Sequence, residues 1–212
     1  MGYESPMPVQ EEVIPFLLGD DNDVIALAQT GTGKTAAFGL PILQKIDVTT
    51  YHPQALVLCP TRELCLQIAD DLNDYSKYID NLKVLPVYGG SSIESQIKTL
   101  KRGVHVVVAT PGRLLDLMNR KTVDLSLVKN VIMDEADEML NMGFTDSINA
   151  ILAEVPENRN MLLFSATMPK EIANITKKYM KNPKEIVIGN KNEGNKNIRD
   201  IYYMVQARDK YL

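Results

Sequence analysis

Seven short apolar runs recur along the chain, and most of them are continuous rather than alternating. They occupy residues 23–28, 55–59, 83–88, 104–109, 130–134, 160–165 and 184–189. Unbroken runs of this length are typical of strands that are covered on both faces. Helical spacing of apolar residues lies between them, in Leu64, Ile68 and Leu72 and again in Ile172, Ile175 and Tyr179. The alternation predicts an α/β fold with a doubly wound, mainly parallel sheet and helices on both faces.

The loops that follow the first six runs carry unusual residues. In chain order these loops contain QTGTGKT, PTRE, GGSS, TPGR, DEAD and SATMP. In open parallel sheets, ligands bind beyond the carboxyl ends of the strands. We therefore expect these loops to share one edge of the sheet and this edge to be the functional site. Pro15 and Pro41 fall inside two predicted helices, where we expect a kink or a break.

The segment AQTGTGKT, residues 28–35, has the composition of a phosphate-binding loop. It follows a predicted strand and opens a predicted helix, and Gly31 and Gly33 allow successive amides to point inward. The pattern assigns Lys34 to the β and γ phosphates of a nucleotide and the Thr35 hydroxyl to Mg²⁺. One departure is Ala28, where the usual pattern begins with glycine. The expected nucleotide contacts are Gln29, Thr30, Gly31, Thr32, Gly33, Lys34 and Thr35.

Four carboxylates crowd the segment VIMDEADEML, residues 131–140: Asp134, Glu135, Asp137 and Glu138. Because close carboxylates repel one another, a cation, hydrogen-bond donors or solvent must lie beside them. Asp134 ends an apolar strand, where a phosphate loop needs its metal ligand, and Glu135 is placed to orient or deprotonate water. With Lys34, this pair predicts nucleotide hydrolysis. Without the phosphate loop, a solvated acidic turn would explain the same residues, and Glu138 is most simply a solvated helix residue.

The PTRE and TPGR loops share one design. Each places a threonine, Thr61 or Thr110, where a helix N-cap belongs and an arginine, Arg62 or Arg113, in the first turn. Free amides, a helix dipole and a cation suit phosphate oxygens rather than base edges. Structural capping alone would use the same residues, but their shared edge favours sequence-independent contact with a nucleic-acid backbone. The candidate contacts are Pro60, Thr61, Arg62, Gly89, Gly90, Thr110, Pro111, Gly112 and Arg113.

Composition limits the remaining possibilities. The 23 Lys and Arg and the 27 Asp and Glu give a net charge of −4, so any nucleic-acid binding must be local. Cys59 and Cys65, with only His52 and His105 elsewhere, are too few for a zinc site and are predicted to be reduced thiols in or near the core. We find no signal peptide and no apolar stretch near the roughly 20 residues of a membrane span, so we expect a cytoplasmic protein.

Beyond Gly189 the composition becomes polar and loses its periodicity. We expect a first domain over residues 1–189, a linker over 190–197, and the start of a truncated second unit over 198–212.

In order, the segments GYESPMPVQ (2–10), AQTGTGKT, PTREL (60–64), GG (89–90), TPGR (110–113), DEAD (134–137) and SAT (165–167) resemble the first RecA-like domain of a DEAD-box RNA helicase, most closely the bacterial type. The resemblance implies a RecA-like P-loop NTPase fold and an RNA-dependent ATPase that couples ATP hydrolysis to RNA binding and local duplex unwinding. RNA rather than DNA as partner comes only from the resemblance.

The resemblance also implies roles for individual residues. Gln10 would read the adenine edge, for which its amide offers both a donor and an acceptor, and Tyr3 would stack on the base. Asp137 would bond Ser165 and Thr167, which couple the nucleotide to RNA. A second RecA-like domain, absent from this chain, would supply arginines to the γ-phosphate, and we expect the protein to act as a monomer.

Two other functions remain open. One is a P-loop ATPase or nucleotide switch without a nucleic-acid role. The other is a noncatalytic clamp that binds RNA in the presence of ATP and scaffolds other proteins. The presence of Glu135 argues against this function.

Overall fold

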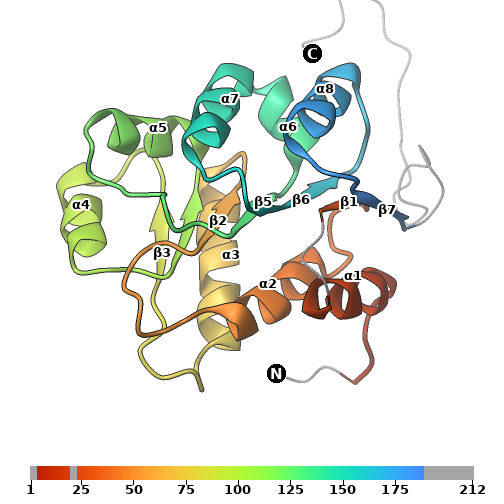
Figure 1. The fold of residues 1–212 in the computed structure, drawn as a ribbon, viewed down its shortest axis with the longest axis horizontal. Coiled ribbons are helices and arrows are strands. Elements are labelled where there is room, and N and C mark those ends of the chain that lie inside the picture. The colour runs from red at the N-terminus through yellow and green to blue at the C-terminus, as the bar shows by residue number, and fades with distance from the viewer. Residues whose placement is uncertain (1–3, 20–22, 189–212) are drawn as a thin grey trace, which may run out of the picture.

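Seven parallel strands form one sheet in the order β3-β4-β2-β5-β6-β1-β7 (Figure 1). The structure is a computed structural model that describes residues 4–19 and 23–188. The strands are β1 (Val24–Leu27), β2 (Ala55–Leu58), β3 (Val84–Val87), β4 (Val106–Ala109), β5 (Asn130–Met133), β6 (Asn160–Ser165) and β7 (Lys184–Val187). Each lies inside one of the predicted apolar runs, so the predicted strands are confirmed, and the described sheet is wholly parallel.

Helices cover both faces of the sheet, as predicted (Figure 1). One face carries α1 (Pro8–Leu18), α2 (Lys34–Lys45) and α3 (Arg62–Tyr75). The other carries α4 (Ile93–Lys101), α5 (Pro111–Asn119), α6 (Ala136–Asn141), α7 (Thr145–Glu154) and α8 (Lys170–Tyr179). The expected breaks at Pro15 and Pro41 do not occur, because α1 and α2 each continue through their proline.

The core consists of two hydrophobic layers, one on each side of the sheet. Leu56 and Leu58 of β2 belong to the layer under α4–α8, whereas Ala55 and Val57 belong to the layer under α1–α3. Successive strand residues point to opposite faces, so a strand covered on both sides must be apolar at every position. This explains why the runs in the sequence are continuous.

Two free cysteines, Cys59 and Cys65, lie fully buried in the layer under α1–α3, which confirms the prediction of reduced core thiols. The Cys65 Sγ atom lies 3.1 Å from the Val108 carbonyl oxygen. Contact with the Cys65 thiol, and then burial, raises the pKa of the Cys59 thiol, so Cys59 stays protonated.

A buried histidine, His105, connects two loops at the amino ends of the strands. The Lys83 amide donates to its Nδ1 atom over 3.0 Å, and its Nε2 atom lies 3.2 Å from the Val48 carbonyl oxygen. The neutral ring with its proton on Nε2 satisfies both contacts. Burial lowers the pKa of His105 below its ordinary value of 6.5.

Stability is therefore expected to fall as the pH drops through and below about 6.5, because the unfolded chain then binds a proton that folded His105 excludes. Thermal unfolding from pH 7.5 to 5.5 measures this slope. His105→Gln should flatten it, while the same change at exposed His52 should leave it unchanged. An unchanged slope in His105→Gln would contradict the assignment.

In the described residues no helix is long and apolar enough to cross a membrane. Tyr3, the predicted linker and the predicted start of a second unit lie outside the described residues.

Candidate functional site

The sequence-predicted loops gather at the carboxyl edge of the sheet, as expected. The Ala28 amide, where the phosphate loop begins, donates to the Ser165 carbonyl oxygen at the end of β6 over 3.0 Å. The Asp134 amide donates to the Leu58 carbonyl oxygen at the end of β2 over 2.9 Å. Backbone hydrogen bonds thus extend the sheet into the loops that carry the motifs and fix their relative positions.

The phosphate loop adopts the turn that its glycines predict. Gly31 and Gly33 have φ angles of +76° and +80°, which residues with a Cβ atom rarely adopt. Gly33 is the N-cap residue of α2, and the Thr32 hydroxyl donates to the Gln29 carbonyl oxygen over 2.8 Å. The first amides of α2 and its positive dipole end therefore face the mouth of the loop, where an anion is favoured.

Lys34 and Asp134, which the sequence places a hundred residues apart, form a buried ion pair. The Lys34 Nζ atom lies 3.3 Å from Asp134 Oδ1, and the two side chains are 7% and 4% exposed. Burial raises the pKa of Asp134, and the neighbouring Lys34 ammonium opposes that effect. The structure thus brings together the predicted phosphate lysine and the predicted metal carboxylate.

Glu135 adopts the left-handed conformation, with φ 50° and ψ 50°, at the N-cap position of α6. A non-glycine residue in this region is strained by on the order of 1–3 kcal/mol and is often found at functional sites. Its amide donates to Asp134 Oδ1 over 3.0 Å, and its side chain is half-buried. Burial, and next the charge of Asp134, raises the pKa of the Glu135 carboxyl, which makes it a better proton acceptor.

Gln10 lies against the phosphate loop and is buried. Its Nε2 atom donates to the Gly33 carbonyl oxygen over 3.2 Å, and its Oε1 atom accepts from the Met7 amide over 2.9 Å. The sequence suggested an adenine contact and gave no sign of this link between α1 and the loop. An amide oxygen and NH₂ group each keep capacity for a second hydrogen bond.

Asp137 contacts Thr167 across the ends of β5 and β6. Its Oδ2 atom accepts from the Thr167 amide over 2.9 Å and from the Thr167 hydroxyl over 2.8 Å. The expected bond from Asp137 to Ser165 is wrong, because the Ser165 hydroxyl donates to the Thr167 carbonyl oxygen over 2.7 Å. Ser165 is fully buried at the end of β6, and its hydroxyl bond closes the turn over residues 165–167.

The two candidate helix starts differ in their caps. Thr61 is the N-cap of α3 and its hydroxyl accepts from the Leu64 amide over 3.2 Å. Thr110 holds the N-cap position of α5 but makes no side-chain capping bond, and Pro111 follows as the first helical residue. The cap predicted at Thr61 is confirmed. Thr110 stands at the predicted N-cap position but its side chain does not bond to the first turn.

The three loops proposed for RNA lie in contact with one another. The Arg62 guanidinium carbon lies 5.0 Å from the centre of the Tyr88 ring, next to Gly89 and Gly90. Arg113 was expected to offer a cation at its helix start, and its Nη1 atom donates to the Ser91 carbonyl oxygen over 3.1 Å and to Gln96 Oε1 over 3.0 Å. The Arg113 guanidinium is thus held in place by α4, which presents a buried acceptor beside the α5 start.

Sequence reasoning missed Gln96, which is 6% exposed. A signal was present, because Gln96 falls among the apolar positions Ile93, Ile97 and Leu100 on the packed side of α4. A polar residue on such a face must find partners inside the protein.

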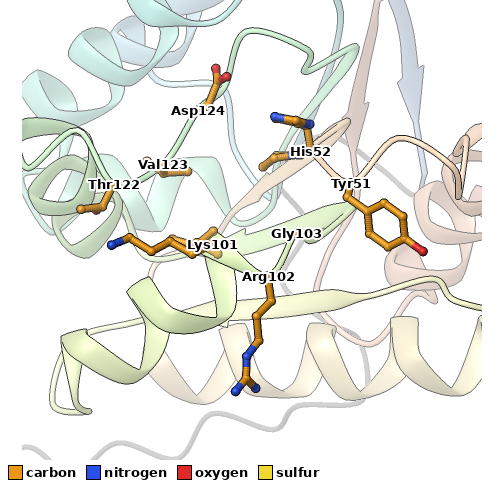
Figure 2. A pocket seen from close by; sticks show the side chains of 10 residues that line it. Tyr51, His52, Lys101, Arg102, Gly103, Thr122, Val123 and Asp124 are labelled. Atoms are coloured by element: carbon orange, nitrogen blue, oxygen red, sulfur yellow. The ribbon is translucent and has the colours of Figure 1, made fainter.

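A cavity of about 400 Å³ lies at the opposite edge of the sheet (Figure 2). Its lining comes from segments that precede β2, β4 and β5, including Tyr51, His52, Lys101 and Thr122. Figure 2 shows that Arg102 points away from the other labelled side chains. A strand of four residues such as β2, at about 3.3 Å per residue, separates this edge from the carboxyl edge of the sheet by on the order of 13 Å. None of the sequence-predicted site residues lines this cavity.

A parallel sheet with a phosphate loop after β1 and a lysine–aspartate pair between the ends of β1 and β5 defines a RecA-like P-loop domain. Residues 7–175 match the family model described as DEAD/DEAH box helicase. The chain belongs to this family.

Similar proteins agree with this assignment. The chain is 51% identical over 208 residues to a Mycobacterium tuberculosis protein named ATP-dependent RNA helicase DeaD, an alignment covering 98% of this chain and 37% of that protein. It is 48% identical to Bacillus cereus DEAD-box ATP-dependent RNA helicase CshA, covering 100% of this chain and 40% of the relative. The chain therefore spans well under half the length of these relatives.

The fold matches that of a crystallised DEAD box protein from the hyperthermophile Methanococcus jannaschii. The TM-score is 0.84 at 46% sequence identity, and the match covers 88% of this chain and 50% of that one. A Sulfolobus tokodaii structure described as a hypothetical ATP-dependent RNA helicase gives a TM-score of 0.80 at 44% identity.

Proposed function

We propose that this chain is the first RecA-like domain of an ATP-dependent RNA helicase. In this reaction ATP and water give ADP and phosphate, and the cycle is coupled to RNA binding and local duplex unwinding. The observation that carries the proposal is the buried contact of 3.3 Å between Lys34 Nζ and Asp134 Oδ1 beneath the phosphate loop. We assign residues 1–189 to this domain, 190–197 to a linker and 198–212 to the start of a second RecA-like domain.

Hydrolysis needs phosphate binding, charge neutralisation and an oriented water. Residues Gln29 to Thr35 would cradle the phosphates with backbone amides, and Lys34 would reach the β and γ phosphates. The half-buried Glu135 carboxylate, whose pKa is raised, would orient or deprotonate the attacking water.

The residues beside the loop fit a bound Mg²⁺. Magnesium prefers hard oxygen ligands, and the Asp134 carboxylate and the Thr35 hydroxyl, which hydrogen-bonds Asp71 in this structure, would supply them. Asp134 is 3% exposed and pairs with Lys34 through Oδ1. A second cation would stabilise the negative charge on the carboxylate oxygen that does not face the lysine. When bound, Mg²⁺ supplies Lewis-acid stabilisation of phosphate charge.

Adenine preference is assigned to Gln10 and Tyr3. Gln10 already bonds the Gly33 carbonyl oxygen, so a base bound by its remaining donor and acceptor would be sensed directly by the phosphate loop.

RNA binding is assigned to the loops at the same edge, through Pro60 to Arg62, Gly89, Gly90 and Thr110 to Arg113. Helix starts and glycine amides contact phosphates and carry no base readout, so we expect binding that is independent of sequence. The Asp137 contact with Thr167, and Ser165 beneath it, would couple this surface to the nucleotide.

ATPase assays of the full-length protein test the proposal. Rates are compared with no nucleic acid, single-stranded RNA, duplex RNA and DNA. The helicase proposal expects strong stimulation by RNA, whereas equal rates in all four samples would favour a P-loop ATPase without a nucleic-acid role. RNA that is held in the presence of ATP without any hydrolysis would favour the noncatalytic clamp.

The 212-residue chain alone is expected to bind adenine nucleotide weakly and to hydrolyse it very slowly. The reason is that a second domain is proposed to supply arginines to the γ-phosphate and the other half of the RNA surface. Nucleotide titration and single-turnover hydrolysis, with the full-length protein in parallel, measure both effects. Robust RNA unwinding by the chain alone would overturn this expectation.

A further inference from the structure

Gln96 on α4 is the centre of a buried hydrogen-bond network. Its Nε2 atom donates to Ser91 Oγ over 2.7 Å and to the Tyr88 carbonyl oxygen over 3.2 Å. Its Oε1 atom accepts from Arg113 Nη1 over 3.0 Å. Both Nε2 hydrogens and one oxygen lone pair are used, at a side chain that is only 6% exposed.

The network joins segments that are distant in sequence. Tyr88 and Ser91 flank Gly89 and Gly90 after β3, while Arg113 lies in the first turn of α5. The Ser91 carbonyl oxygen also accepts from Arg113 Nη1 over 3.1 Å, so Arg113 of α5 is bonded both to this loop and to Gln96 of α4. The Tyr88 ring lies under the Arg62 guanidinium at 5.0 Å, which brings the start of α3 into the same unit.

The chemistry of this network suits a glutamine side chain. Serine and carbonyl oxygens need a donor and a guanidinium needs an acceptor, and one amide supplies both at a spacing that a carboxylate or an ammonium cannot match. A buried group that loses its partner is costly, so the three loops would shift to find new partners if Gln96 were removed.

We propose that Gln96 is a positioning residue that sets the PTRE, GG and TPGR loops in the mutual geometry needed to grip an RNA backbone. It acts through Tyr88, Ser91 and Arg113, and its own side chain is too buried to contact RNA. This inference rests on the proposed RNA binding of the same loops. It goes beyond that proposal by naming a residue outside the motifs on which the grip depends.

The test is the RNA-stimulated ATPase activity of the full-length protein with the substitution Gln96→Met. Methionine keeps the length of the side chain and removes both the NH₂ donor and the oxygen acceptor of the amide. We expect the RNA concentration for half-maximal stimulation to rise about tenfold. The maximal rate at saturating RNA and the KM for ATP should stay within about twofold, because the phosphate loop lies outside the network. A change in ATP KM or maximal rate, with RNA dependence unchanged, would overturn the inference.

Two further variants keep the test sharp. Gln96→Glu retains an acceptor for Arg113 but loses the donors to Ser91 and Tyr88, so we expect an intermediate RNA affinity. Gln44→Met, at an exposed position on α2, is the matched control and should behave as wild type. An RNA titration of Gln96→Met that coincides with that of Gln44→Met would exclude the positioning role.

A double-mutant cycle examines the Arg113 contact itself. If Arg113→Ala and Gln96→Met disturb one network, the loss of RNA affinity in the double variant should be smaller than the product of the two single losses. Independent, multiplicative losses would contradict the network. If the wild-type protein shows no RNA stimulation, the proposed function fails. If it does but Gln96→Met titrates identically, only this inference fails.

Discussion

Glu135→Gln is expected to keep ATP binding and to lower ATP turnover by about 10²–10⁴-fold, the usual contribution of a positioned acid or base. The amide keeps the size of the side chain and cannot accept a proton. Glu135 adopts a left-handed backbone directly after Asp134. Because glutamine has the same size and shape as glutamate, we expect the substitution to leave this geometry unchanged. Equilibrium nucleotide binding and single-turnover hydrolysis by the full-length protein separate the two effects.

Lys34→Ala is the contrasting variant and should lose both binding and turnover, because Lys34 is proposed to reach the phosphates and is the ion-pair partner of Asp134. Glu138→Gln is the matched control, since Glu138 lies three residues further on and its side chain is exposed. It should retain wild-type turnover. Equal turnover in Glu135→Gln and wild type would remove Glu135 from the mechanism.

Gly33→Ala is expected to weaken ATP binding by at least about tenfold, the second large effect. A Cβ atom at this position would lie 2.5 Å from Gln10 Nε2 and 2.8 Å from Met7 Sδ. The ends of the Gln10 and Met7 side chains would have to move aside, which would break the bond between Gln10 and the Gly33 carbonyl oxygen. Isothermal titration with an ATP analogue, together with thermal unfolding, measures both consequences.

Gly31→Ala separates steric conflict from backbone strain. Gly31 also has a positive φ angle, but a Cβ atom there would meet nothing within 4 Å. Both substitutions carry a backbone penalty of about 1–2 kcal/mol, so the difference between them reports the contact with Gln10 and Met7. Equal ATP affinities in the two variants would show that this contact does not shape the loop.

The strands and the phosphate loop could be predicted because their signals are local. A four-residue strand buried on both faces must be apolar throughout, and Gly31 and Gly33 mark the turn by the conformation they allow. The shared edge followed from parallel topology alone. The order of the strands did not follow, because no local pattern states which strand lies beside which.

The sequence did not reveal the side-chain partners that only the folded chain brings together. Arg113 was expected as a cation from its place in a helix start, and nothing in the sequence showed that α4 supplies Gln96 as an acceptor for it. Ser165 was paired with Asp137 by the family resemblance, but a short turn gives its hydroxyl the Thr167 carbonyl oxygen as acceptor. Such choices among acceptors depend on distances of a few ångströms, which sequence spacing does not encode.

The most direct measurement is the release of a labelled strand from a short RNA duplex by the full-length protein, with ATP, with no nucleotide, and with the Glu135→Gln variant plus ATP. The proposed helicase activity predicts repeated strand release only by the wild-type protein with ATP. An intact duplex under conditions in which the same wild-type sample hydrolyses ATP would contradict it.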